Sequence, residues 1–271
     1  LGSVYALIAL GYTMVYGIAK MLNFAHGDVI MVGAFITYTI CSTAGLSPVL
    51  GVVVSIIVCT LLGVLIEKVA YRPLRKASSP LAVLITAIGV SYLLQNVALL
   101  IFGANAKAFT SVVPVAPVKL ANGQINITGE TIVTILSCLV IMAGLMLFIN
   151  KTKAGQAMLA VSEDKGAAQL MGINVDGTIA LTFAIGSALA AVAGVLLCSA
   201  YPSLTPYTGS MPGIKAFVAA VFGGIGSIPG AFIGGILLGI IEIFGKAYIS
   251  SQMADAIVFA VLIVVLLVKP S

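Results

Sequence analysis

The residues of this chain that could do chemistry are few and widely separated. The only histidine, His26, lies two positions before Asp28, and Glu242 precedes Lys246 by about one helical turn. A lone histidine without clustered acids supplies neither a metal site nor a catalytic centre, and the sequence holds no His-Glu-x-x-His pattern. It also lacks the Gly-x-x-x-x-Gly-Lys-Ser/Thr loop that cradles nucleotide phosphates. We therefore predict that the chain is not an enzyme, holds no metal and does not itself hydrolyse ATP.

Composition indicates that these residues belong to a membrane protein. Of the 271 residues, 61% are hydrophobic and 8% are charged, whereas a soluble domain carries about 25% charged residues. So few charges cannot cover a soluble surface, but lipid accepts an apolar one. The net charge of +5 comes from basic residues scattered between apolar stretches, which favours a role in membrane topology over nucleic-acid binding. The four cysteines lie in separate apolar stretches and are predicted to be packing residues.

Apolar segments recur along the whole chain. A helix needs roughly 20 apolar residues to cross a bilayer, and its backbone must be hydrogen-bonded within the segment. We therefore predict an all-α polytopic bundle with about eight or nine membrane segments, some of them discontinuous, in one transmembrane domain over 1–271. Its halves are 1–150 and 178–271. The candidate segments are Val4–Leu22, Val29–Ala44, Pro48–Ile66, Leu81–Phe102, Thr131–Ile149, Ile179–Ala200, the short Ile214–Phe222, Ala231–Phe244 and Ala256–Val268.

The charged loops between these segments predict the orientation of the chain. The basic run Lys68–Lys76 directly follows the third segment, and the positive-inside rule places that loop in the cytoplasm. Counting crossings from there places the loop 151–177 inside and the loop 103–130 outside. The dipeptide Asn122-Gly123 in the outer loop is typical of a hairpin turn, so we expect a small extracytoplasmic β-hairpin there.

Two breaks interrupt the apolar pattern, at Asn23–Asp28 and at Gly223–Gly230. Non-helical backbone at membrane depth is tolerated inside protein or beside a watery cavity, so paired breaks indicate a transport path. The alternative is that both are tight interfacial turns, with Asp28 favouring the N-terminus of the following helix. The two interpretations are compatible. The candidate path residues are Asn23, Phe24, His26, Gly27, Asp28, Gly223, Gly224, Gly226, Ser227 and Pro229.

Four other polar residues lie inside the apolar segments. Glu242 and Lys246 have the spacing of an ion pair on one helix face, and we interpret them as structural. We expect Gln95 and Asn96 to form hydrogen bonds between helices rather than to contact a substrate.

The loop 151–177 is too organised to be a plain connector. Its pattern predicts two short helices, with Ser162 capping the second, Leu170 and Met171 exposed, and Gly172 ending it. Such helices are expected to dock a partner; the alternative is a helix lying on the lipid surface. The candidate coupling residues are Ser162, Glu163, Asp164, Ala167, Ala168, Leu170, Met171 and Gly172.

The motifs, in their order along nearly the whole chain, resemble the permease subunits of branched-chain amino-acid ABC importers of the LivH type. The matching stretches are Tyr5–Gly17, Leu22–Asp28, Val69–Arg75, Ala167–Asn174 and Gly223–Ala231. The resemblance implies a multi-pass protein of the bacterial inner membrane that imports leucine, isoleucine and valine. It also implies a second, related permease, two ATP-binding subunits that carry ATP and Mg²⁺, and a periplasmic binding protein, with no cofactor on this chain.

The sequence departs from the family pattern at two places. Asp28 stands where the family usually has Glu, and Gly166 rather than Glu precedes Ala167-Ala168 in the coupling loop. Relatives with similar motifs carry urea or short amides, so these are alternative substrates. A secondary transporter or a passive channel are further alternatives, although the organised loop favours an ATP-driven importer.

Overall fold

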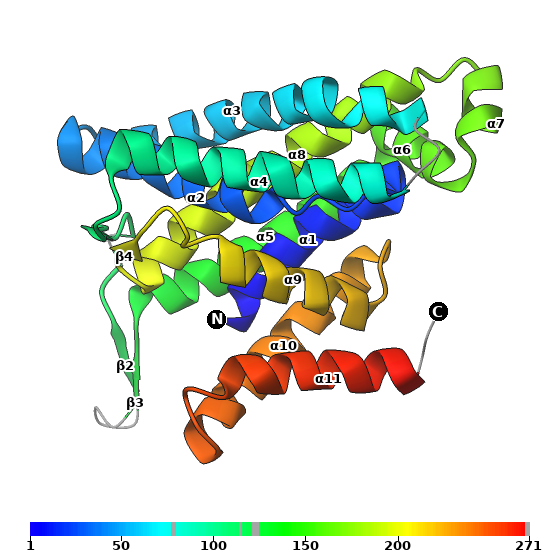
Figure 1. The fold of residues 1–271 in the computed structure, drawn as a ribbon. Helices are drawn as coiled ribbons and strands as arrows, with labels where there is room; N and C mark the ends of the chain where they lie inside the picture. Colours follow the sequence, from blue (N-terminus) through cyan, green and yellow to red (C-terminus); the bar gives the residue numbers. More distant parts are fainter. Residues whose placement is uncertain (77–79, 114, 121–124, 269–271) are drawn as a thin grey trace.

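The protein is a helical bundle in a computed structural model that describes residues 1–76, 80–113, 115–120 and 125–268. The long helices run between two ends, one carrying short strands and the other carrying two short helices (Figure 1). The helices are α1 (Gly2–Ala19), α2 (His26–Tyr38), α3 (Pro48–Ile66), α4 (Pro80–Phe102), α5 (Gly129–Lys151), α6 (Lys153–Glu163), α7 (Lys165–Leu170), α8 (Val175–Ala200), α9 (Ser210–Gly223), α10 (Ile228–Tyr248) and α11 (Ala254–Val268). Single turns of π-helix (Thr39–Thr43 and Glu67–Tyr71) extend α2 and α3, and a 3₁₀ turn covers Pro73–Lys76.

Among the described residues, six helices are long and apolar enough to cross a membrane: α1, α3 with its extension, α4, α5, α8 and α10. The apolar helices α9 and α11 are shorter, and α2 has 13 residues. The protein is therefore a polytopic helical membrane protein in which full-length and short apolar helices are combined. The short helices α2 and α9 each adjoin one of the two predicted breaks, whereas α11 adjoins neither.

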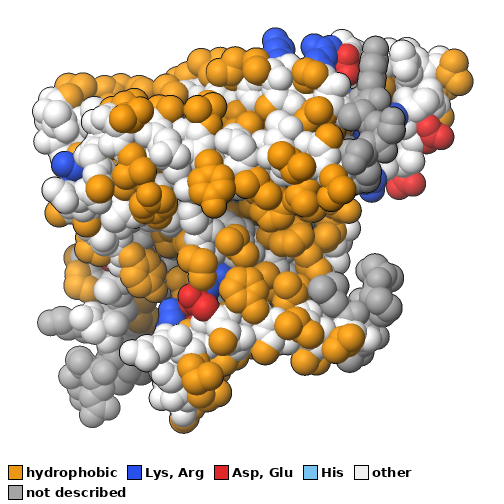
Figure 2. Space-filling model, in the orientation of Figure 1, with side chains coloured by type: hydrophobic (Ala, Val, Ile, Leu, Met, Phe, Trp, Pro, Cys, Tyr) orange, Lys and Arg blue, Asp and Glu red, His pale blue; other side chains and the backbone are white. Residues whose placement is uncertain are grey.

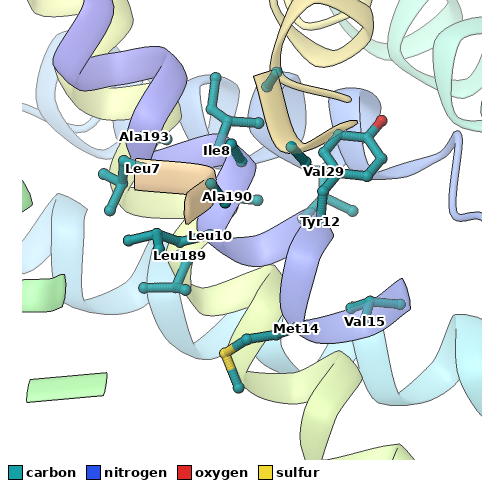
Figure 3. Close-up of a cluster of buried hydrophobic side chains, with 14 of the residues drawn as sticks. Leu7, Ile8, Leu10, Tyr12, Met14, Val15, Val29, Leu189, Ala190 and Ala193 are labelled. Atoms are coloured by element: carbon teal, nitrogen blue, oxygen red, sulfur yellow. The ribbon is translucent and has the colours of Figure 1, made fainter. Parts of the chain in front are cut away.

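Helix α1 forms the centre of the bundle. Every side chain from Val4 to Val15 is buried, as expected for a helix that is apolar on all faces. It packs against α8, α9 and α10, and Figure 3 shows Leu10 of α1 beside Leu189 and Ala190 of α8. Because both breaks also contact α1, this helix connects the parts of the candidate site.

The outer surfaces of α3, α4 and α5 are apolar and exposed. Leu61, Leu100 and Val140 project from these helices, and Figure 2 shows hydrophobic side chains across most of the visible face. A soluble protein would cover such an area, whereas lipid tails solvate it. The apolar outer surface of these helices therefore agrees with the low content of charged residues in the sequence.

The two ends of the bundle differ in structure. At one end β1 (Lys107–Ala108) pairs antiparallel with β4 (Ser203–Leu204), and β2 (Val118–Leu120) pairs antiparallel with β3 (Ile125–Ile127). We call this the hairpin end; the predicted turn residues Asn122 and Gly123 lie outside the described residues. The opposite end, the α6–α7 end, carries the two short helices of the predicted coupling loop (Figure 1).

Candidate functional site

The first break lies deep in the bundle. Helix α1 ends at Ala19, Lys20 takes a left-handed φ of 56°, and the chain then returns along α1 without helical structure. Helix α2 begins at His26, whose ring fills the space beside Gly11 of α1. Gly11 is eight residues before the end of α1, which corresponds to about 12 Å along its axis. The break is therefore an interruption within the bundle and not a turn at its surface.

The side chains of Asn23 and His26 in this break are buried, that of Phe24 is half-buried, and all three pack on neighbouring elements. Asn23 Oδ1 accepts a 3.0 Å hydrogen bond from the Tyr71 hydroxyl. The Phe24 ring lies 6.1 Å from that of Phe217 in α9. His26 packs edge-on against Tyr12 with ring centroids 4.6 Å apart, and its Nε2 has no hydrogen-bond partner among the described residues.

Asp28 belongs to a polar network that joins three helices. Gln95 Nε2 of α4 donates to Asp28 Oδ1 in the first turn of α2 at 2.9 Å. The same nitrogen lies 3.2 Å from Ser210 Oγ at the start of α9. The predicted interhelical role of Gln95 is confirmed. The same prediction was wrong for Asn96, which faces outward and donates to Tyr92 O within its own helix at 2.8 Å.

The starts of α2 and α9 meet at a glycine contact. A Cβ atom on Gly209 would lie 1.8 Å from Gly27 O, and one on Gly213 would lie 2.8 Å from Gly27 Cα. The N-termini of two short helices therefore face each other inside the bundle, a position where discontinuous helices bind ligands in transporters. Sequence reasoning missed Gly209–Gly213, although its Gly-Ser-Met-Pro-Gly composition marks a break.

The second break forms a tight turn between α9 and α10. The backbones of Gly223 and Gly230 touch, and Gly224 and Gly226 have φ of 89° and 96°. Ser227 Oγ accepts a 3.2 Å hydrogen bond from Gly230 N, and Pro229 lies in the first turn of α10. Glycines allow this conformation because a side chain would clash or strain the backbone.

The second break packs against α1 nearer to the C-terminal end of that helix than the first break does. Gly226 lies on Gly17, six residues beyond Gly11, which corresponds to about 9 Å along the helix. It also lines a cavity of about 270 Å³ together with Thr13, Ser162 and Glu163. The structure therefore brings the second break next to the predicted coupling loop, while the first break faces the start of α9.

The predicted coupling loop, 151–177, contains the two predicted helices, α6 and α7. Ser162 lies within α6 and donates to Leu159 O at 2.7 Å, so its predicted role as a cap was wrong. Asp164 caps α7 instead, with Oδ1 accepting from the amides of Gly166 and Ala167 at 2.7 and 3.0 Å. Helix α6 ends at Glu163, and Asp164, whose backbone is extended, separates it from α7. Aspartate is a favoured residue at such an N-cap position.

Helix α7 presents an apolar tip. The exposed fractions of Leu170 and Met171 are 90% and 83%, whereas Ala168 is buried against the bundle. Gly172 then ends the helix with φ of 83°, as its residue type predicts. Two large apolar side chains so exposed at a helix tip favour contact with another protein.

Arginine and acidic residues tie α3 to the start of α8 at this same end. Arg75 Nη1 donates to Asp176 Oδ1 at 2.5 Å and also pairs with the buried Glu67. Arg72 pairs with Asp176, and this carboxylate raises the pKa of Arg72. The basic run predicted to set orientation therefore also anchors the helix that follows the coupling loop.

A partly buried charged cluster lies between α9, α10 and α11. Lys215 Nζ is 2.9 Å from Glu242 Oε1 and 2.5 Å from Asp255 Oδ1. Lys246 Nζ is 2.6 Å from the same Glu242 oxygen, which confirms the predicted pair. Sequence reasoning missed Lys215 and Asp255, although a single lysine in the apolar segment Ile214–Phe222 was a signal. We call these four residues the charged cluster: Lys215, Glu242, Lys246 and Asp255.

These features define the class of protein: a polytopic membrane protein with interrupted helices and an organised loop at one end. The family model described as "Branched-chain amino acid transport system / permease component" matches residues 1–266. The chain belongs to this family, and the resemblance found from the motifs is confirmed.

Curated relatives extend over the full chain. The "High-affinity branched-chain amino acid transport system permease protein LivH" of Escherichia coli K12 is 46% identical over 100% of this chain and 91% of its own length. The corresponding protein BraD of Pseudomonas aeruginosa is 47% identical with the same coverage. A "Probable branched-chain amino acid transport permease protein LivH" of Methanocaldococcus jannaschii is 32% identical over 90% of this chain and 78% of its length.

Proposed function

We propose that this chain is the membrane permease subunit of an ATP-driven importer that carries leucine, isoleucine and valine into the cytoplasm. The observation that carries the proposal is 46% identity over the whole chain to LivH, a branched-chain amino acid permease. The absence of a phosphate-binding loop from the sequence supports an external energy source. The exposed tip of α7 supports a site at which that source acts.

The proposed assembly follows from the orientation predicted by the basic residues. The α6–α7 end faces the cytoplasm, where two ATP-binding subunits carry ATP and Mg²⁺ and contact Leu170 and Met171. The hairpin end faces the periplasm, where a binding protein delivers the amino acid. A second, related permease completes the path across the inner membrane.

Coupling would pass from α7 to the interior through α1. Lys165 of α7 donates to the Ala19 carbonyl at the end of α1, and α1 contacts both breaks at Gly11 and Gly17. Motion of α7 driven by the ATPases would therefore shift α1 relative to the starts of α2 and α9. Alternating exposure of these interruptions would move the amino acid without a permanent tight site.

Uptake by the complete transporter tests the proposal. Proteoliposomes with this permease and its partner subunits should accumulate labelled leucine when ATP and binding protein are present. Unlabelled isoleucine and valine should compete, and urea should not. Competition by urea, with weak competition by valine, would assign the chain to the urea and short-amide group. Accumulation without ATP would indicate a secondary transporter.

A further inference from the structure

Three residues of the charged cluster, Lys215, Glu242 and Lys246, line a cavity whose size matches an amino acid. The cavity holds about 250 Å³ and is also lined by Tyr5, Leu197 and Met211. This volume corresponds to roughly eight water molecules at ~30 Å³ each. Leucine has nine non-hydrogen atoms. The lining combines charged groups of both signs with apolar side chains, as ligand sites do.

The signs of the charges in this cavity match a zwitterion. Lys215, Lys246 and Glu242 line the cavity, and Asp255 pairs with Lys215 from outside the lining, so the cluster as a whole holds two cations and two anions. A ligand that carries one charge of each sign preserves that balance. The ring of Tyr5 also lies 5.9 Å from Lys215 Nζ, which holds this lysine between an aromatic face and two carboxylates.

One carboxylate oxygen of the cluster is left without a partner. Glu242 has a 1% exposed side chain, and its Oε1 accepts from both lysines, but Oε2 has no hydrogen-bond partner among the described residues. Buried polar atoms in native proteins are nearly always hydrogen-bonded, so an orphaned carboxylate oxygen beside a cavity points to a ligand donor.

The exposure of the cluster points to a water-filled path and not to lipid. The side chains of Lys246 and Asp255 are 42% and 48% exposed. Figure 2 shows charged atoms gathered between α9 and α11 on a largely hydrophobic face. Ionisable residues within membrane segments face the protein interior or a watery cavity because lipid does not solvate them.

We propose that this cavity binds the ammonium and carboxylate groups of an α-amino acid during translocation. Glu242 Oε2 accepts hydrogen bonds from the ligand ammonium, and Lys246 donates to the ligand carboxylate. The side chains of Tyr5, Leu197 and Met211 contact the aliphatic part. The inference rests on the proposed transport function and identifies how this permease selects an amino acid: urea carries neither charged group.

Photocrosslinking with a diazirine analogue of leucine tests the site in the complete transporter. Wild-type protein should form adducts on the segments that contain Leu197 and Met211, and excess leucine should suppress them. 3-Methylbutylamine and 4-methylpentanoate, which each lack one charged group, should compete roughly 10-fold less well or worse, because each loses a charge-assisted hydrogen bond.

Two variants and a matched control accompany the labelling. Glu242→Gln removes the proposed acceptor for the ligand ammonium, and Lys246→Met removes the proposed donor to the ligand carboxylate. Because Lys246 is partly exposed, its replacement should disturb folding less than that of Glu242. Both should lower adduct yield and maximal leucine uptake roughly 10-fold. Glu130→Gln, at the start of α5 and outside the cluster, should match wild type.

The outcomes separate the site from the function. Normal labelling and uptake in Lys246→Met, or adducts confined to other segments, would overturn the site while leaving leucine transport intact. Failure of the wild-type transporter to take up leucine at all would instead overturn the proposed function. Thermal melting of each purified variant identifies any loss that comes from misfolding, and a stable, inactive Lys246→Met supports the site.

Discussion

Lys165 Nζ donates a 2.9 Å hydrogen bond to the carbonyl oxygen of Ala19, so α7, the second helix of the predicted coupling loop, is bonded to the end of the central helix α1. The last carbonyls of a helix have no partner within it, and a cation there also favours the helix dipole. Burial lowers the pKa of Lys165, and the nearby cations Arg75 and Lys20 lower it further. This contact is a direct connection between α7 and the buried interior.

Removing this contact should uncouple transport from ATP hydrolysis. We expect Lys165→Met to lower the number of leucine molecules transported per ATP several-fold, because α7 would move without pulling on α1. The measurement is paired uptake and phosphate release in proteoliposomes. Lys153→Met, an exposed lysine of α6, is the control. An unchanged ratio in Lys165→Met would show that force reaches the interior by another route.

The lowered pKa of Lys165 also predicts how stability changes with pH. The folded protein releases this proton at a lower pH than the unfolded chain, whose lysine has the ordinary pKa of 10.5. Between these two values the unfolded state binds more protons, so stability rises with pH. The melting temperature of wild type relative to Lys165→Met should therefore increase as pH approaches 10.5. A constant difference across this range would contradict the prediction.

Gly172 should tolerate asparagine but not proline. Its φ is 83°, whereas proline is restricted to about −65° and also lacks the amide that donates to Gln169 O at 3.0 Å. We expect Gly172→Pro to leave the transporter in the membrane but to abolish coupled uptake. Gly172→Asn should retain most uptake, since asparagine adopts left-handed φ comparatively easily. Normal uptake in the proline variant would count against the coupling assignment.

Arg75 and Arg72 should contribute unequally to stability although both pair with Asp176. Arg75→Met leaves the buried carboxylate of Glu67 without its cation, and we expect a loss of roughly 3 kcal/mol in the free energy of unfolding. Arg72→Met removes an exposed pair, which contributes little. Denaturant titration of both purified variants compares them. Equal losses would show that the Asp176 contacts matter more than burial of Glu67.

The contact between α2 and α9 should not accept a side chain. Gly209→Ala places a methyl group against the Gly27 carbonyl, and relief of that clash should cost roughly 1–3 kcal/mol and displace the start of α9. We expect reduced melting temperature and reduced uptake together. Gly144→Ala, in α5 where nothing lies within 4 Å of the added Cβ, is the control. It should be neutral or slightly stabilising.

Sequence alone determined the features that depend on local chemistry. An apolar composition allows only a membrane environment, and long apolar runs allow only helices there, because the backbone has no other hydrogen-bond partners. The spacing of Glu242 and Lys246 predicted their pair, and Gly172 predicted the end of α7, because both are contacts within one or two helical turns. The family followed from motifs spread along the whole chain.

Only the tertiary structure decided which distant residues meet. The first break contacts Gly209–Gly213 rather than Gly223–Gly230, because the chain after Lys20 returns along α1 to the level of Gly11. Likewise, Lys215 and Asp255 join Glu242 only when α9, α10 and α11 pack together. Neither contact leaves a periodic pattern in the sequence. Each depends on how far the helices are displaced along one another and on the angle at which they cross. The path residues chosen from the local breaks stay a prediction, and it is the packing of the helices that brings the charged cluster together.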